Sequence, residues 1–164
     1  MMYHNRKAFS MLVALVVIIL MTVVASFILN LSGKIIKETT TQFQKEQSVL
    51  LAKSYTEYAI MSVMSNDRNV TGNDCIENIN GKVGNPVNGQ GYEIRTRIAY
   101  IGNDGFDNCS NTRILSNAVT TPESSLNIIV DVYIKYRDID HPSIGIDNTV
   151  VPWTTYHRRT LQKI

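Results

Sequence analysis

Residues 8–29 read AFSMLVALVVIILMTVVASFIL, a stretch in which Ser10, Thr22 and Ser26 are the only polar side chains. In an α-helix these 22 residues would cover about 33 Å, slightly more than the ~30 Å hydrocarbon core of a bilayer. Because backbone amides in lipid must be hydrogen-bonded within the segment, a single span has to be helical. The sequence therefore predicts one membrane-spanning helix.

The chain as a whole has 164 residues, a mean hydropathy of −0.06 and 44% hydrophobic residues. This length fits one compact domain with appendages. The apolar content excludes a wholly disordered chain, and the long uncharged run excludes a wholly cytosolic one. The formal net charge of +2 is too small to indicate nucleic acid by itself.

Three fates compete for the apolar segment. A secretory signal peptide would be cut near Ala25, but the apolar run continues past that point to Leu31. An uncleaved signal anchor would keep the whole segment in the membrane. In the third fate, cleavage on the cytoplasmic side between Ala8 and Phe9 makes the apolar run the new N-terminus.

A resemblance supports the third fate. The short basic leader MMYHNRKA ends in a small residue, and Phe9-Ser10-Met11-Leu12 and the run LVALVVI follow it. This start resembles the prepilin-type N-terminus of type IV pilins and type II secretion pseudopilins. The resemblance implies that a prepilin peptidase cuts after Ala8 and methylates the new amine of Phe9.

One position departs from that family. The family has a glutamate at the fifth mature position, where this chain has Val13. Aligning LVALVVI instead of the cleavage site implies a deletion that includes the glutamate. A carboxylate buried in lipid or in a fibre core is costly unless it is paired, and in the family it meets the terminal amine of the preceding subunit. Its absence resembles tip or minor subunits, so the resemblance implies a minor subunit.

A second helical segment follows without a proline or glycine between Gly33 and Gly72. Ile36, Phe43 and Leu50 recur at a spacing of seven, which indicates an amphipathic helix. We expect the face from Leu50 to Met64 to pack against the chain's own sheet. A coiled-coil stalk is the alternative, but the heptad register is short. The three consecutive threonines at 39–41 predict a bend or fraying.

The remaining sequence predicts an antiparallel sheet. Residues 66–91 are rich in Asn, Asp and Gly and favour a surface loop. Apolar and polar residues then alternate over 92–101, 126–137 and, less regularly, 153–161, as in strands with one buried face. The predicted fold class is therefore α+β, with a long N-terminal helix packed on a small antiparallel sheet. Pilins share this architecture.

These segments predict four parts of the chain. Residues 1–8 form a prepilin-type leader, and residues 9–31 form a transmembrane or fibre-core helix. Residues 32–65 form an amphipathic helix that continues into the head, and residues 66–164 form an extracytoplasmic globular domain.

The two cysteines, Cys75 and Cys109, both lie in loops on the far side of the predicted membrane. Outside the cytoplasm two cysteines are more often bridged than catalytic. The resemblance supports a disulfide, since many pilins carry one in the sheet region. Closing a loop of this length would contribute about 3–4 kcal/mol in the chain-entropy model.

Calcium is the one candidate cofactor. Asp104 and Asp107, in the stretch GNDGFDN at 102–108, offer hard oxygen ligands, and some pseudopilins hold calcium near the sheet. The spacing is not that of an EF-hand, and Asn-Asp-Gly also fits a hairpin turn. His141 and His157 have no third ligand at zinc spacing, and no catalytic motif is present. We therefore do not expect an enzyme.

Basic and aromatic residues of the predicted strands raise the question of nucleic acid. They include Arg95, Arg97, Arg158 and Arg159, with Tyr92, Tyr100 and Tyr156. Such residues more often form the solvated face of a sheet. Without the leader, basic and acidic side chains balance at 14 each, which disfavours a nucleic-acid partner without excluding it.

We therefore expect a structural subunit, a minor pilin or pseudopilin of a type IV pilus, a type II secretion system or a DNA-uptake machine. Its partners would be other pilin-like subunits, an inner-membrane assembly platform and a prepilin peptidase. Arg6 and Lys7 favour a cytoplasmic N-terminus in the bacterial inner membrane, with the globular domain in the periplasm before it joins a fibre or pseudopilus. The alternative is an uncleaved single-span protein with a ligand-binding or sensory domain.

Overall fold

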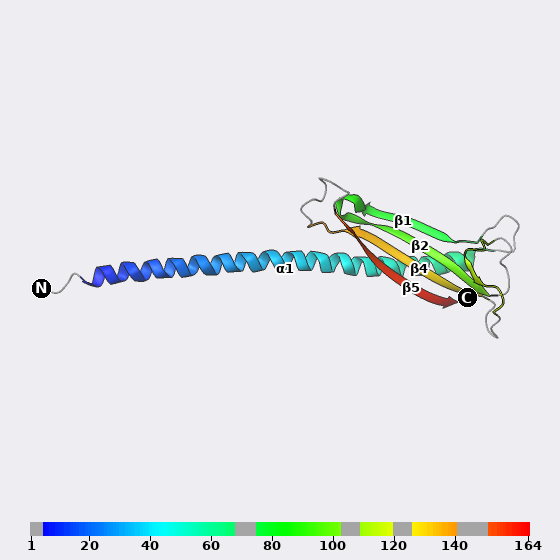
Figure 1. The fold of residues 1–164 in the computed structure, drawn as a ribbon, viewed down its shortest axis with the longest axis horizontal. Helices are drawn as coiled ribbons and strands as arrows, with labels where there is room; N and C mark the ends of the chain where they lie inside the picture. Colours follow the sequence, from blue (N-terminus) through cyan, green and yellow to red (C-terminus); the bar gives the residue numbers. More distant parts are fainter. Residues whose placement is uncertain (1–4, 68–74, 103–108, 120–125, 141–150) are drawn as a thin grey trace. The chain divides into compact units, whose positions relative to one another are not determined.

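The computed structural model describes residues 5–67, 75–102, 109–119, 126–140 and 151–164. Its elements follow the chain in the order helix, then strands (Figure 1). Two compact units divide at Gln42, and we call residues 1–42 the stem and residues 43–164 the head. The elements are α1 (Asn5–Ser65), β1 (Asn78–Asn85), the 3₁₀ turn η1 (Pro86–Asn88), β2 (Gln90–Gly102), β3 (Ile114–Ser116), β4 (Leu126–Arg137) and β5 (Trp153–Lys163).

The stem is the first part of the long helix α1. One helix near the N-terminus is long and apolar enough to cross a membrane, as the sequence predicts. The helix continues through the three threonines at 39–41, where a bend or fraying was expected. Each threonine hydroxyl donates to the carbonyl four residues earlier at 2.8–3.1 Å. The three hydroxyls are therefore hydrogen-bonded within the helix.

The head contains one sheet of order β1-β2-β4-β5, in which all neighbours are antiparallel. The short strand β3 pairs in parallel with the end of β2. The alternation predicted for 92–101 and 126–137 is confirmed, because Ile94, Ile98 and Tyr100 of β2 and every second residue of β4 are fully or almost fully buried. We call this buried side the inner face and the opposite side the outer face.

The α1 segment 43–65 covers the inner face and completes the core. Its buried side chains are mostly small, with Ala52 and Ala59 at 0% exposure and Val63 at 1%. Ser48 and Thr56 are also buried, at 0% and 1%. Small side chains let the helix axis approach the sheet closely, and the β-branched residues of β2 and β4 fill the space between.

The helix therefore presents a different face to the sheet from the one expected. Leu50, Tyr58, Met61 and Met64 are 53–64% exposed instead of buried. The expectation that the helix packs on its own sheet is correct, but the seven-residue apolar repeat is wrong as a guide to the packed face. Size decides the contact here, because the larger side chains would hold the helix away from the sheet.

Strand β1 lies within the segment expected to be a surface loop. Eight of its residues pair with β2 from Asn78–Arg97 to Asn85–Gln90. Its glycines have a structural role: Gly84 has φ +67°, and a Cβ on Gly81 would lie 2.1 Å from the Tyr55 hydroxyl of α1. At Gly81 the edge strand needs a glycine because the helix residue Tyr55 lies too close for a side chain.

Polar groups join the start of the head helix to the sheet. The Gln44 side-chain amide donates to the carbonyls of Gly89 and Arg137, at 3.3 and 3.2 Å. The Tyr92 hydroxyl donates to the Gln44 carbonyl at 3.2 Å. Burial, and then the neighbouring Tyr136, raise the pKa of Tyr92, so its hydroxyl stays a donor at neutral pH.

Replacing Gly81 with alanine should destabilise the head. The new Cβ meets the Tyr55 ring and its hydroxyl, and overpacking of this kind costs about 1–3 kcal/mol. Thermal unfolding followed by near-ultraviolet circular dichroism should show a lower Tm for the full chain in detergent. Gly33→Ala is the matched control, since nothing lies within 4 Å of its Cβ. Equal melting of the two variants would contradict the proposed close contact.

Candidate assembly surface

The described stem exposes apolar side chains on all sides of the helix. Met11, Phe27 and Leu29 are 66–74% exposed, and the other large apolar residues from 12 to 31 are exposed as well. A helix that is hydrophobic all round is stable only in lipid or inside a larger assembly. No ionisable side chain occurs between Lys7 and Lys34, so nothing in this stretch opposes a purely apolar environment.

The head helix also exposes large apolar side chains, on the side away from the sheet. We call this set the outer stripe, and its members are 53–64% exposed. At 100° per residue the stripe lies on the face opposite to Ser48, Ala52 and Ala59, which are buried against the sheet. The residues of the outer stripe are Phe43, Leu50, Tyr58, Met61 and Met64.

The predicted processing site belongs to the beginning of α1. Ala8 and Phe9 lie within its helical backbone, while their side chains fall outside the part of the structure that is described. The fifth residue after the predicted cut, Val13, is 45% exposed. Cleavage and methylation at Ala8 and Phe9 remain predictions.

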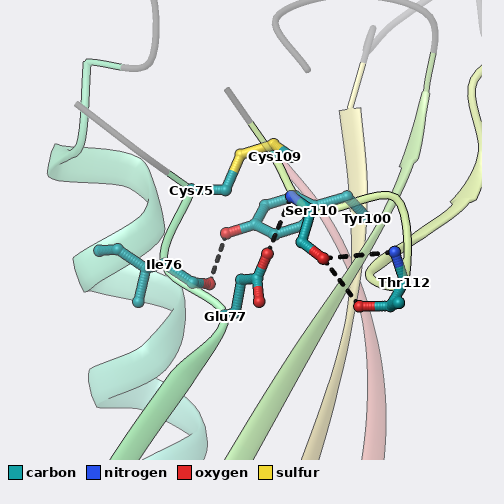
Figure 2. Close-up of a disulfide and its surroundings, with 7 residues drawn as sticks. All are labelled: Cys75, Ile76, Glu77, Tyr100, Cys109, Ser110 and Thr112. Carbon is teal, nitrogen blue, oxygen red and sulfur yellow. Dashed lines mark hydrogen bonds between the residues drawn. A yellow bond between two sulfur atoms is a disulfide. The ribbon is translucent and has the colours of Figure 1, made fainter. Parts of the chain in front are cut away.

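The two cysteines form a disulfide, as expected, and hydrogen bonds surround it (Figure 2). The Cα atoms of Cys75 and Cys109 are 4.9 Å apart, within the normal range for a bridge. The Tyr100 hydroxyl donates to the Ile76 carbonyl at 2.6 Å, and the Ser110 amide donates to Glu77 Oε1 at 2.9 Å. The bridge therefore joins the segment that enters β1 to the segment that leaves β2.

The expected calcium ligands cannot be placed. Asp104 and Asp107 lie outside the described residues. Within the described part of the chain, no group of three or more His, Cys, Asp or Glu side chains is close enough to hold a metal ion. Among the described carboxylates, Asp138 accepts a hydrogen bond from the Asp140 amide at 3.0 Å, as in a turn.

The sheet separates the basic and aromatic residues that the sequence placed together. Arg95, Arg97 and Arg159 lie on the outer face, where Arg159 binds both carboxylate oxygens of Asp131 at 2.7 and 2.8 Å. This pairing, with a further contribution from His157, lowers the pKa of Asp131. Tyr92, Tyr100, Tyr156 and Arg158 lie on the inner face, and the Nε of Arg158 is buried.

Sequence reasoning missed the polar residues that position the helix. Gln44, Ser48 and Thr56 are buried although apolar residues were expected in their place. One signal was available, since Ser48, Ala52 and Thr56 recur at a spacing of four and continue to Ala59. Small residues at helical spacing indicate a helix face that packs closely on a neighbouring element, just as large apolar residues at that spacing indicate a face in the core.

Comparisons with known proteins add no family. No family model, no curated protein and no solved structure matches this chain. The described residues themselves show a membrane-length apolar helix, a head in which the helix segment 43–65 packs on an antiparallel sheet, and one disulfide.

Removing the disulfide should lower the stability of the head strongly. The chain-entropy model assigns about 3–4 kcal/mol to a loop of this length, and each kcal/mol lowers the Tm of a domain of the size of the head by about 4 °C. Thermal unfolding of the full chain with and without a reductant measures the effect. A variant with both Cys75→Ser and Cys109→Ser is the control, because reductant should not change its Tm. Free thiols in the unreduced native chain would contradict the bridge.

Proposed function

We propose that this chain is a structural subunit that assembles through α1, a minor pilin or pseudopilin. The observation that carries this proposal is the outer stripe, which extends apolar surface beyond the membrane-length segment. A tether needs only about 20 apolar residues to span a bilayer. It gains nothing from Phe43, Leu50 and Met61 exposed to water. A subunit packed beside other helices buries them.

The outer stripe is large enough to contribute several kcal/mol to assembly when it is buried. Fully burying one Leu, Phe or Met side chain is worth about 1.5–3 kcal/mol relative to leaving it exposed. Five such residues would supply several kcal/mol even if each were only partly covered. Meanwhile the stem would leave lipid for a bundle of similar helices, and this exchange replaces one apolar environment with another.

The absence of a carboxylate near the start of the stem supports a minor role. An isolated charge in lipid or in a helix bundle must be paired, and this chain carries none between Lys7 and Lys34. It therefore offers no side-chain partner for the terminal amine of a preceding subunit. A subunit at the tip of a fibre, or one used to initiate it, needs no such partner.

The setting proposed for this assembly is the bacterial inner membrane. Arg6 and Lys7 would hold the N-terminus in the cytoplasm, and the head would lie in the periplasm before the subunit enters a fibre or pseudopilus. The disulfide suits this oxidising compartment. A prepilin peptidase would cut between Ala8 and Phe9, and an inner-membrane platform would then extract the stem. The machine would be a type IV pilus, a type II secretion system or a DNA-uptake apparatus.

Processing at the predicted site tests the proposal directly. In cells with an active prepilin peptidase, the mature chain should begin at Phe9 with a methylated amine, which N-terminal sequencing and mass spectrometry detect. A large residue in the variant Ala8→Leu should block the cut, while the peptidase still processes its other substrates. A wild-type chain that keeps Met1 under these conditions would instead support an uncleaved sensory or binding protein.

The outer stripe gives a second test. Leu50→Gln should reduce the share of the subunit recovered in sheared fibres or pseudopili severalfold, because it places a polar group in an apolar contact. The head should keep its Tm, since Leu50 is 57% exposed and touches no core. Lys53→Gln is the matched control on an exposed site of the same helix. Normal incorporation of the Leu50 variant would argue against assembly through this face.

A further inference from the structure

The outer face of the sheet carries ordered rows of polar side chains. Strand pairing places residues of β1, β2, β4 and β5 side by side, so that each row crosses the sheet. The row through Asn78 contains Arg97, Asp131 and Arg159. The next two rows are Asn80–Arg95–Tyr133–His157 and Lys82–Glu93–Lys135–Thr155.

This face has a surplus of positive charge that the net charge of the whole chain hides. Its solvent-accessible cations outnumber its carboxylates by six to two among the described strand residues, with Arg137 of the same register left out because it is buried. The whole chain has a formal charge of only +2, because most of its 14 acidic residues lie outside the bounds of these strands. The cations are Lys82, Arg95, Arg97, Lys135, Arg159 and Lys163, and the carboxylates are Glu93 and Asp131.

The two carboxylates neutralise only part of this charge. Asp131 binds Arg159 and His157, and Glu93 binds Arg95 at 2.6 Å. Lys82 and Lys135 form no ion pair within the described part of the chain. Arg97 donates to Asn80 Oδ1 at 3.1 Å, a neutral acceptor, while its cross-strand neighbour Asp131 forms its ion pairs with Arg159 and His157. These three cations lie on neighbouring strands.

The cations also line a depression in the sheet surface. An open hollow of about 460 Å³ is bounded by Lys82, Arg95 and Arg97, with Asn80 and Glu93 beside them. Two guanidinium groups and one ammonium group in this lining, of which only Arg95 is paired with the Glu93 carboxylate, suit an oxyanion with several oxygens, since arginine donates in a planar fork. The hollow lies over β1 and β2, while an aromatic pair occupies the other half of the face.

That pair is a stack of Tyr133 on His157. Their ring centroids are 4.4 Å apart and their planes differ by 7°. His157 belongs to β5, at the edge of the sheet, and its side chain is 40% exposed. Its hydrogen bond to Asp131 at 2.8 Å holds the ring in place. The exposed His157 ring is therefore held in a fixed orientation, on which a further planar group could stack.

We propose that the outer face of the sheet binds single-stranded nucleic acid. Phosphates would contact the unpaired cations of β1, β2 and β4, and a base would extend the Tyr133–His157 stack at β5. Basic side chains that follow a backbone, with aromatic rings for the bases, are the recurring design of such sites. A bare polyanion would use the charge alone and leave the aromatic stack unused, and a duplex would present no free base to it.

This inference does not depend on assembly through α1. That assembly uses the side of the head helix that faces away from the sheet, whereas the proposed binding site is the outer face of the sheet. The test uses the full chain in a nonionic detergent and a fluorescently labelled oligothymidylate, with binding followed by anisotropy at several salt concentrations. We expect an affinity that falls with salt, with a slope of about −0.7 for each phosphate contact. A chain that binds the oligonucleotide yet is never processed at Ala8 would keep this inference and remove the proposed function.

Matched variants separate charge from stacking. Arg97→Gln should weaken binding and make the salt slope shallower by about 0.7, whereas Lys53→Gln, the same charge change on the exposed helix, should do neither. His157→Ala should weaken binding at least fivefold with the slope nearly unchanged, and His157→Phe should restore it, because both variants lose the bond to Asp131 but only one keeps a ring.

Two outcomes would overturn the proposal. The first is equal binding by wild type, Arg97→Gln and Lys53→Gln, which would mean that the outer face is not the site. The second is equal affinity for oligothymidylate, for an abasic strand of the same length and for inorganic polyphosphate, with no effect of His157→Ala. That result would assign the face to polyanions in general and remove the role of the bases.

Discussion

The close contact between the head helix and the inner face of the sheet is the constraint on which the rest of the structure depends. Ala52 and Ala59 are fully buried against a layer of Ile and Val side chains from β2 and β4. Because small residues make this contact, the helix must turn its larger apolar residues the other way. This one helix–sheet contact therefore produces both the core of the head and the exposed outer stripe.

The same contact explains how much of the fold the sequence could predict. The apolar run before Leu31 has the length of a membrane helix, the alternation over 126–137 has a strong period of two, and the structure confirms a helix and a strand there. The prediction of the packed helix face was wrong because hydrophobicity favours burial of Leu50, whereas the small size needed for a close contact favours burial of Ala52. Strand β1 was missed because Gly81 is needed for a close approach to Tyr55, a contact that no local pattern reveals.

The candidate sites follow a similar division. A disulfide was predictable because the chain has two cysteines on one side of a membrane segment, and the pair Cys75–Cys109 is present. The charge of the outer face was not predictable from composition, since it arises only when strand pairing places Lys82, Arg97 and Lys135 on one side of the sheet. Net charge is a property of the chain, whereas attraction for a polyanion is a property of one face.

The position of the disulfide would have a mechanical consequence if the chain were pulled by its helix, as the proposed extraction of the stem requires. The bridge spans a sequence separation of 34 residues that includes β1 and β2. If tension tears the head open, the load passes from sulfur to sulfur and bypasses the enclosed hairpin. Roughly 110 Å of chain, at about 3.3 Å per residue, is thereby withheld from extension. The head could therefore unfold under force without extending to the full contour length of its chain.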